Sequence, residues 1–369
     1  MAGEPASLPA WQTLTEEQSR RWTEVLDHVA AALPSGVVSV VIDGGSAHAA
    51  VVADRLADAL HAGGRPCARL TGHTPPASTG QPPLDARYRL EAGDNRRTEG
   101  TPDTVTVADG SGWLARPPSG RWDVVVWLRT PPVGPGANGG RGAGCDIVVD
   151  LHDPTWPVIR HLSDRLAPQD RWYLSESRAF FATRAATWDT KFGDDLPAYA
   201  AAVNEADLPV GGVVVDIGCG TGRALPALRD AVGPYGVVIG LDLTPQMLTA
   251  ARAHAGRAAA DLLLGDARNL PLADASVDAV FAAGLLTHLP DSEAGLRELA
   301  RITRPGGRLV LFHPSGRAAL AARHGRPLRP DEPLAEAPLR RSTGLTGWHL
   351  NRYDDPPHRF FATATRRNA

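Results

Sequence analysis

The sequence predicts an α/β protein with two domains. Two segments have the pattern of a buried strand, a glycine-rich turn and a helix, and they begin at residues 37 and 213. Strands that alternate with helices are typical of α/β folds, in which helices cover a largely parallel sheet. The length of 369 residues leaves room for two hydrophobic cores. We expect the domains to span residues 1–165 and 166–369.

Composition and charge disfavour several classes of protein. Hydrophobic residues make up 43%, charged residues 21%, and the net charge is -3, as in ordinary globular proteins. Proteins that coat nucleic acid are usually basic, so we expect no nucleic-acid partner. We find no leader-like N-terminus and no run of 18 apolar residues, so we expect no membrane partner. Cys67, Cys145 and Cys219 are widely separated, which disfavours a disulfide framework and a zinc site and favours a cytoplasmic protein.

The elements of the first half follow from spacing and turn residues. Residues 13–33 carry apolar residues at helical spacing, and Thr15 offers an N-cap. The apolar run 37–42 predicts a strand, and residues 51–62 predict a helix that ends at two glycines. The following segments are expected to be a loop (71–103), two strands (104–107 and 122–128), a tether rich in glycine and proline (131–144) and a strand (147–151).

A second glycine turn follows the predicted strand 213–216. The glycines within Gly218–Gly222 let the backbone turn tightly and approach a ligand, and the helix behind them presents free N–H groups. Two later predicted strands also end in an acid, Asp242 and Asp266. Ligands of doubly wound sheets bind at the carboxyl ends of the strands, so we expect these residues to meet in one crevice.

Residues 211–312 resemble the core of class I S-adenosylmethionine-dependent methyltransferases. The segments that carry the resemblance are Val215–Gly222, Gly240–Thr244, Gly265–Ala267, Val277–Phe281, His288–Asp291 and Arg304–Leu309. The first has the spacing G-x-G-x-G, whereas dinucleotide-binding enzymes have G-x-G-x-x-G. The resemblance implies a Rossmann-like sheet, closed by an antiparallel pair at 347–353 and 359–364, with residues 304–307 as the turn into the fifth strand.

The resemblance also implies S-adenosylmethionine as the cofactor and a set of residues that hold it. Asp216 and the glycine backbone face its methionine part, Asp242 its ribose, and Asp266 the edge of its adenine. The implied cofactor-binding residues are Asp216, Gly218, Gly220, Gly222, Asp242, Leu243, Asp266, Ala267 and Gly284.

Methyl transfer requires the protein to align two partners and to exclude water. His288 and His313 are candidate catalytic bases, and the alternative for each is a structural histidine bonded to nearby backbone. Neither Asn-Pro-Pro-Tyr nor Asp-Pro-Pro-Tyr follows the fourth strand, which disfavours methylation of bases and favours a small-molecule methyl acceptor. Phe181 and Trp188 are expected to close over the pocket, with core packing as the alternative.

Residues 20–160 resemble, more weakly, a P-loop domain of the uridine-kinase type. A working loop has the pattern G-x-x-x-x-G-K-[ST], but the closing positions counted from Gly44 are Ala49–Val51. The only lysine of the chain, Lys191, lies in the second half. The resemblance therefore implies a parallel α/β domain without catalysis, which serves as a scaffold, a dimerisation surface or an allosteric module. A bifunctional protein that handles nucleosides and a cofactor sensor without activity stay open as alternatives, as does the oligomeric state.

Overall fold

The computed structural model describes residues 13–36, 38–44, 46–70, 103–110, 122–130, 145–167, 172–323 and 327–368. The chain divides into two compact units, Met1–Glu176 and Ser177–Ala369. This division falls inside helix α4 (Tyr173–Ala182), later than the boundary that the sequence led us to expect after residue 165. The tether at 131–144 and nearly all of the loop at 71–103 lie outside the described residues.

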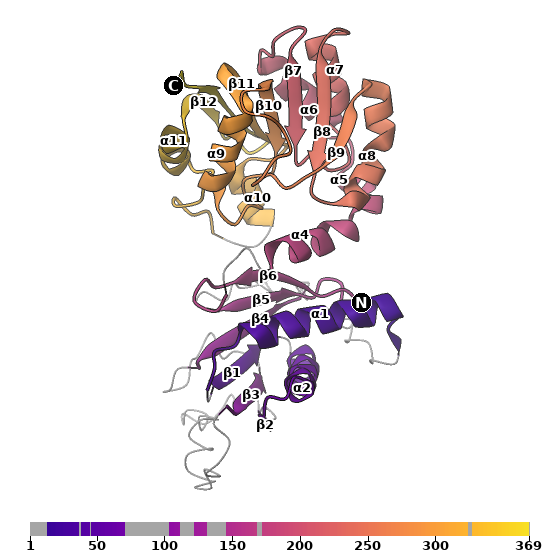
Figure 1. Ribbon diagram of the computed structural model, residues 1–369, viewed down its shortest axis with the longest axis vertical. Coiled ribbons are helices and arrows are strands. Elements are labelled where there is room, and N and C mark those ends of the chain that lie inside the picture. Colours follow the sequence, from indigo (N-terminus) through magenta and orange to yellow (C-terminus); the bar gives the residue numbers. More distant parts are fainter. Residues whose placement is uncertain are drawn as a thin grey trace. The chain divides into compact units, whose positions relative to one another are not determined.

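Unit 1 contains a six-stranded sheet (Figure 1). Its elements are α1 (Glu16–Ala32), β1 (Val38–Asp43), α2 (Ser46–Ala62), β2 (Cys67–Leu70), β3 (Val105–Gly110), β4 (Val124–Arg129), β5 (Ile147–Asp150) and β6 (Val158–Leu162). The strand order is β2-β3-β1-β4-β5-β6, in which β2 to β5 are parallel and β6 is antiparallel to β5. The sequence analysis did not predict β6.

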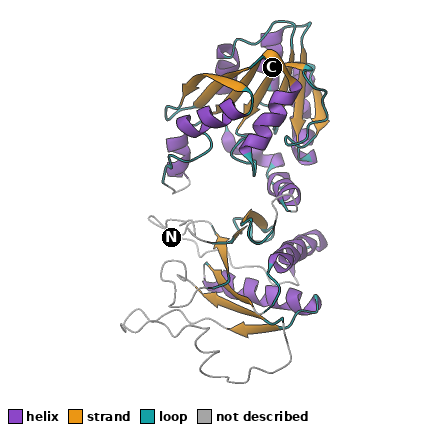
Figure 2. Ribbon diagram, turned by 60° about the vertical axis from the view of Figure 1, so that its left-hand side comes forward, coloured by secondary structure: helices purple, strands orange, loops and turns teal. Residues whose placement is uncertain are grey.

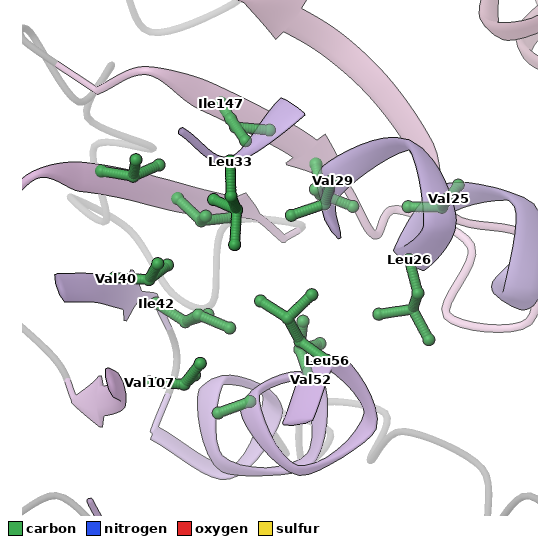
Figure 3. Close-up of a cluster of buried hydrophobic side chains, with 14 of the residues drawn as sticks. Val25, Leu26, Val29, Leu33, Val40, Ile42, Val52, Leu56, Val107 and Ile147 are labelled. Carbon is green, nitrogen blue, oxygen red and sulfur yellow. The ribbon is translucent and has the colours of Figure 1, made fainter. Parts of the chain in front are cut away.

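Two helices bury their apolar faces against this sheet. Helix α1 begins behind a capping box, in which Thr15 and Gln18 each bond the backbone N–H of the other. Side chains such as Leu26 of α1 and Leu56 of α2 meet Ile42 of β1 in one cluster (Figure 3). Unit 1 therefore has a hydrophobic core of its own.

Unit 2 contains a seven-stranded sheet with helices on both of its faces (Figure 2). Its elements are the end of α4, η3 (Ala185–Thr187), α5 (Trp188–Phe192), α6 (Leu196–Glu205), β7 (Val213–Ile217), α7 (Leu225–Val232), β8 (Val237–Asp242), α8 (Pro245–Ala258), β9 (Asp261–Leu264), β10 (Val277–Ala283), α9 (Ser292–Ile302), β11 (Thr303–His313), α10 (Arg317–Arg323), α11 (Glu336–Leu345), β12 (Trp348–Asp354) and β13 (Phe360–Arg366). The strand order is β12-β13-β11-β10-β7-β8-β9.

The direction of these strands confirms the expected Rossmann-like sheet. Strands β11, β10, β7, β8 and β9 are parallel, and β13 pairs antiparallel with both β11 and β12. The closing antiparallel pair is thus present. Parallel strands buried by helices on both faces read as continuous apolar runs, which is why β7 and β8 were recognisable in the sequence.

One segment differs from its expected form. The sequence led us to expect a turn at residues 304–307 before the fifth strand. Instead, β11 already begins at Thr303, which pairs with Val277, and the ladder resumes where Arg308 pairs with Ala279. The intervening residues bulge out of the ladder, because Gly306 has a φ of +79° and bends the strand there.

The longest helices within the described residues, α1 and α2, have 17 residues each. No described helix is both long enough and apolar enough to cross a bilayer.

Candidate functional site

The candidate site lies at the carboxyl end of β7. This strand has β8 on one side and β10 on the other. The chain runs from β7 through β8 to β9 on one side and then crosses back to β10 on the other side. Open α/β sheets bind ligands at such a point. The turn that follows β7 contains Gly218, Gly220 and Gly222, with φ values of +74°, +54° and +83°. Residues with a Cβ rarely adopt these values, so the backbone makes the tight turn that the glycines predict.

The glycines of this turn serve different purposes. A Cβ on Gly222 would lie 3.0 to 3.2 Å from atoms of Leu225, Ala251 and His254, so its absence lets α8 pack closely against the turn. A Cβ on Gly220 would have no atom within 4 Å. Gly220 thus borders open space, where a ligand can approach the backbone.

Asp242, the last residue of β8, is bonded directly to the glycine turn. Its Oδ2 accepts a hydrogen bond from the Gly220 N–H at 2.9 Å, and its Oδ1 accepts one from the Thr244 N–H at 2.8 Å. Burial raises the pKa of this carboxyl group, and the backbone hydrogen bonds partly oppose the rise. The structure thus brings two of the predicted cofactor residues into contact.

Asp216, in β7, is buried beneath the same turn. Its side chain is 2% exposed, and its Oδ1 has no hydrogen-bond partner among the described residues. Burial, together with the nearby charge of Asp242, raises the pKa of Asp216 to about 8. A buried carboxylate oxygen without a donor is costly, and a cationic or N–H group of a ligand would satisfy it. These features fit the ammonium-bearing methionine part of S-adenosylmethionine.

The third predicted acid is placed differently. Asp266 follows β9, and its carboxylate accepts hydrogen bonds from the Arg268 backbone at 3.0 Å and from its guanidinium at 2.9 Å. Ala267 beside it is 7% exposed. Leu243, after β8, offers its carbonyl oxygen to Arg178 Nε of α4 at 3.1 Å. Neither the contact of Asp266 with Arg268 nor that of Leu243 with Arg178 involves another predicted cofactor residue.

The two candidate bases follow β10 and β11. Gly284, with a φ of +70°, follows β10, and a Cβ there would lie 3.7 Å from the His313 ring. His313 Nδ1 lies 3.0 Å from both the N and the O of Ser315, so this ring is bonded to nearby backbone, as the structural alternative requires. His288 is exposed and stacks edge-on against Phe181, with ring centroids 5.1 Å apart.

An aromatic cluster borders His288. Phe181 of α4 also lies 5.0 Å from Phe180 and 5.9 Å from Trp188, measured between ring centroids. The rings of Phe181 and Trp188 are only half-buried, whereas core aromatics such as Phe281 are fully buried. These two rings are thus less buried than the aromatic rings of the core.

Sequence analysis missed three residues that join the segment before α6 to the site. We call residues 185–195 the strap, which contains η3 and α5. Thr221 and Arg223 of the glycine turn contact Asp189 of the strap. These partners are about 30 residues apart, and no spacing rule links a turn to a helix at that separation.

The described part of the chain contains no group of three or more His, Cys, Asp or Glu side chains that could hold a metal ion. What the site offers is a glycine turn with accessible backbone, two buried carboxyl groups and an aromatic rim. Such a site can bind a polar cofactor and shield a reacting centre from water.

Known proteins resemble this part of the chain. The family model described as a methyltransferase domain matches residues 215–311. A demethylmenaquinone methyltransferase of Desulfitobacterium hafniense is 39% identical over 123 residues, which cover 32% of this chain and 49% of that protein. The 27-O-demethylrifamycin SV methyltransferase of Amycolatopsis mediterranei is 39% identical over 174 residues, covering 46% of this chain and 56% of that protein.

A crystal structure of a SAM-dependent methyltransferase from Aquifex aeolicus aligns with 50% of this chain and 98% of its own, at 21% identity and a TM-score of 0.42. The chain spans between 32% and 56% of the length of the first curated relatives that it matches. The matched segment includes the end of β7, the glycine turn, and the strands β8, β9 and β10. Residues 215–311 of unit 2 are therefore similar to a methyltransferase domain, and they lie in a Rossmann-like sheet.

Proposed function

We propose that the chain transfers a methyl group from S-adenosylmethionine to a small-molecule acceptor, and that unit 2 performs the reaction. The observation that carries the proposal is the pair of buried acids that bracket the glycine turn. Asp242 fixes the turn through the Gly220 N–H, and Asp216 keeps one oxygen without a donor among the residues that the structure describes. The curated relatives, named as methyltransferases of a quinone precursor and of a rifamycin, support a small acceptor.

In this proposal the residues of the chain hold and orient the two reactants. The bound cofactor supplies an electrophilic methyl carbon. Asp216 binds the ammonium of its methionine part, and Asp242 accepts the hydroxyl groups of its ribose while it holds Gly220 in place. Leu243, Asp266 and Ala267 border the adenine. Gly220 leaves room for the cofactor, because a Cβ there would point into open space.

The acceptor approaches from the side of β10 and β11. Phe181 and Trp188 exclude water from this side, which strengthens electrostatic interactions within the site. An acceptor that arrives protonated needs a base. His288 is the better candidate, because it is exposed at the aromatic rim, whereas His313 Nδ1 is engaged by the backbone of Ser315.

Calorimetric titration with S-adenosylmethionine tests the proposal. We expect the full chain to bind it, and Asp242→Asn to bind at least about tenfold more weakly, because one charged acceptor is lost. Asp261→Asn is the matched control, since Asp261 is exposed at the start of β9. Absence of binding by the unaltered chain, or equal affinities for the chain and Asp242→Asn, would contradict the proposal.

We propose further that unit 1 is a degenerate P-loop domain that does not bind ATP. The strands β1, β3 and β5 end in or near the buried acids Asp43, Asp109 and Asp150. Arg69 lies beside α2, where its Nη2 bonds the Ala50 carbonyl at 3.3 Å. Asp54 and Asp109 already pair with this arginine.

A triphosphate would therefore meet buried carboxylates and no lysine, so its repulsion is uncompensated. Titration of the full chain with ATP and magnesium should show no heat of binding at concentrations where S-adenosylmethionine binds. Stoichiometric binding of ATP would instead support the bifunctional alternative.

A further inference from the structure

The strap is attached to the glycine turn by two neighbouring side chains. Thr221 Oγ1 donates a hydrogen bond to Asp189 Oδ1 at 2.6 Å. Arg223 Nη2 donates one to the Gly193 carbonyl at 2.6 Å, and its guanidinium also pairs with Asp189 at 3.4 Å and with Asp195 at 2.7 Å. One short turn thus contacts three positions of the strap.

On the side of the turn the contacting side chains are buried, whereas Asp189 of the strap is 45% exposed. Thr221 is 1% exposed and Arg223 is 6% exposed. A single guanidinium faces the two carboxylates of Asp189 and Asp195, and burial raises the pKa of Asp195. Without Arg223 the carboxylates of Asp189 and Asp195 would lie near each other with no cation between them, and their mutual repulsion is unfavourable.

The contacts also fix what the strap carries. Trp188 is the first residue of α5 and directly precedes Asp189. The contacts of Asp189 with the turn therefore act one residue away from the ring that borders the site. The helix ends at Gly193, whose φ of +63° lets the chain reverse there. Since Arg223 bonds the carbonyl of that same glycine, it holds the point at which the strap turns.

From this geometry we infer that Thr221, Arg223 and Asp189 are positioning residues that clamp the strap over the cofactor crevice. The inference rests on the proposed function, because the crevice is the one assigned there to S-adenosylmethionine. Thr221 and Arg223 flank Gly222, so a ligand that orders the turn also orders the clamp. By linkage, an ordered strap must in turn strengthen cofactor binding by the same factor.

Hydrogen exchange without ligand tests the clamp independently of the proposed function. Three variants divide the interaction: Thr221→Val removes the hydroxyl, Asp189→Asn keeps an acceptor but removes a charge, and Arg223→Gln removes the cation. In each variant we expect faster exchange of amides 185–195 and unchanged exchange in β7 and β8. The matched control is Thr190→Val, because Thr190 lies in the same helix but bonds only the Thr187 carbonyl.

Titration with S-adenosylhomocysteine tests the link to the cofactor. We expect Arg223→Gln to raise Kd about tenfold and Arg223→Lys to restore part of the loss, because one charge-assisted pair can re-form. Thr221→Val and Asp189→Asn should combine less than additively, since both act on one hydrogen bond. In turnover assays KM for the cofactor should rise while kcat changes less than twofold.

The outcomes separate the two proposals. If the unaltered chain does not bind S-adenosylhomocysteine, the proposed function fails, whereas the exchange of the strap still reports on the clamp. If strap exchange and Kd in Thr221→Val and Asp189→Asn equal those of Thr190→Val, the clamp is refuted. These two variants suffice for the test if Arg223→Gln does not fold.

Discussion

At the scale of single residues, the site depends on glycines, which have no side chain, as much as on its acidic side chains. Gly222 packs against a helix and Gly220 borders open space, although the two glycines belong to one turn. The sequence predicted that both would be needed but not that their roles differ. That difference depends on Ala251 and His254 of α8, which are distant in the sequence.

This contrast predicts different effects of two alanine substitutions. Gly222→Ala should lower the free energy of unfolding by about 3 kcal/mol, because the new methyl group overpacks the contact with α8 and the backbone is strained. Gly220→Ala should cost only about 1 to 2 kcal/mol, because strain acts without a clash. Urea denaturation measures both values, and equal losses would show that the two positions are equivalent.

Asp216 couples stability to pH. Its folded pKa of about 8 lies above its ordinary value, so the folded chain holds a proton there that the unfolded chain has released. Stability therefore falls as pH rises from about 4 to about 8. We expect Asp216→Asn to melt at a higher temperature than the unaltered chain at pH 8.5, but not at pH 4, and to bind S-adenosylmethionine more weakly. A lower melting temperature at pH 8.5 would contradict this account.

At the scale of elements, α4 shows what sequence patterns miss. The sequence led us to expect that Phe181 of this helix closes over the pocket, but the buried ion pair of the helix was not foreseeable. Glu176, 1% exposed, pairs with Arg21 of α1 and accepts a hydrogen bond from the Ile159 N–H of β6 at 2.6 Å. Its hydrogen bond with His28 raises the pKa of that histidine. Periodicity identifies apolar faces, whereas a buried ion pair between distant helices leaves no periodic signal.

We expect Glu176→Gln to destabilise unit 1 by about 3 to 5 kcal/mol, because the Arg21 guanidinium would stay buried without its carboxylate. Glu24→Gln is the control, since Glu24 also pairs with Arg21 but is half exposed, and it should cost less than about 1 kcal/mol. Urea denaturation followed by tryptophan fluorescence compares them. Similar losses for both variants would show that burial of the pair is unimportant.

At the scale of the whole molecule, the sequence predicted a two-domain α/β organisation and the positions of most strands along the chain. Strands such as β7 and β8 were recognisable because they are apolar throughout. Strand β6 was not, because Arg160 and His161 interrupt its apolar pattern. The expected boundary after residue 165 is too early to include Glu176, because no sequence pattern shows that this residue is bonded into unit 1.

The division inside α4 predicts how fragments behave. A fragment of residues 1–176 should unfold cooperatively, because it retains Glu176. A fragment of residues 1–165 should be less stable by at least about 3 kcal/mol, because Arg21 loses its buried partner. Trp22, whose Nε1 bonds the Pro154 carbonyl at 3.2 Å, reports on both fragments by fluorescence. Equal urea midpoints would show that the part of unit 1 that folds cooperatively ends before α4.

The position of Lys191 gives the chain a chemical handle. It is the only lysine of the sequence and lies exposed in α5, within the strap. An amine-reactive dye can therefore form a side-chain amide at one place only, next to the residues inferred to hold the strap. The label needs no engineered cysteine, and its anisotropy would follow the motion of this segment while ligands are added to the native sequence.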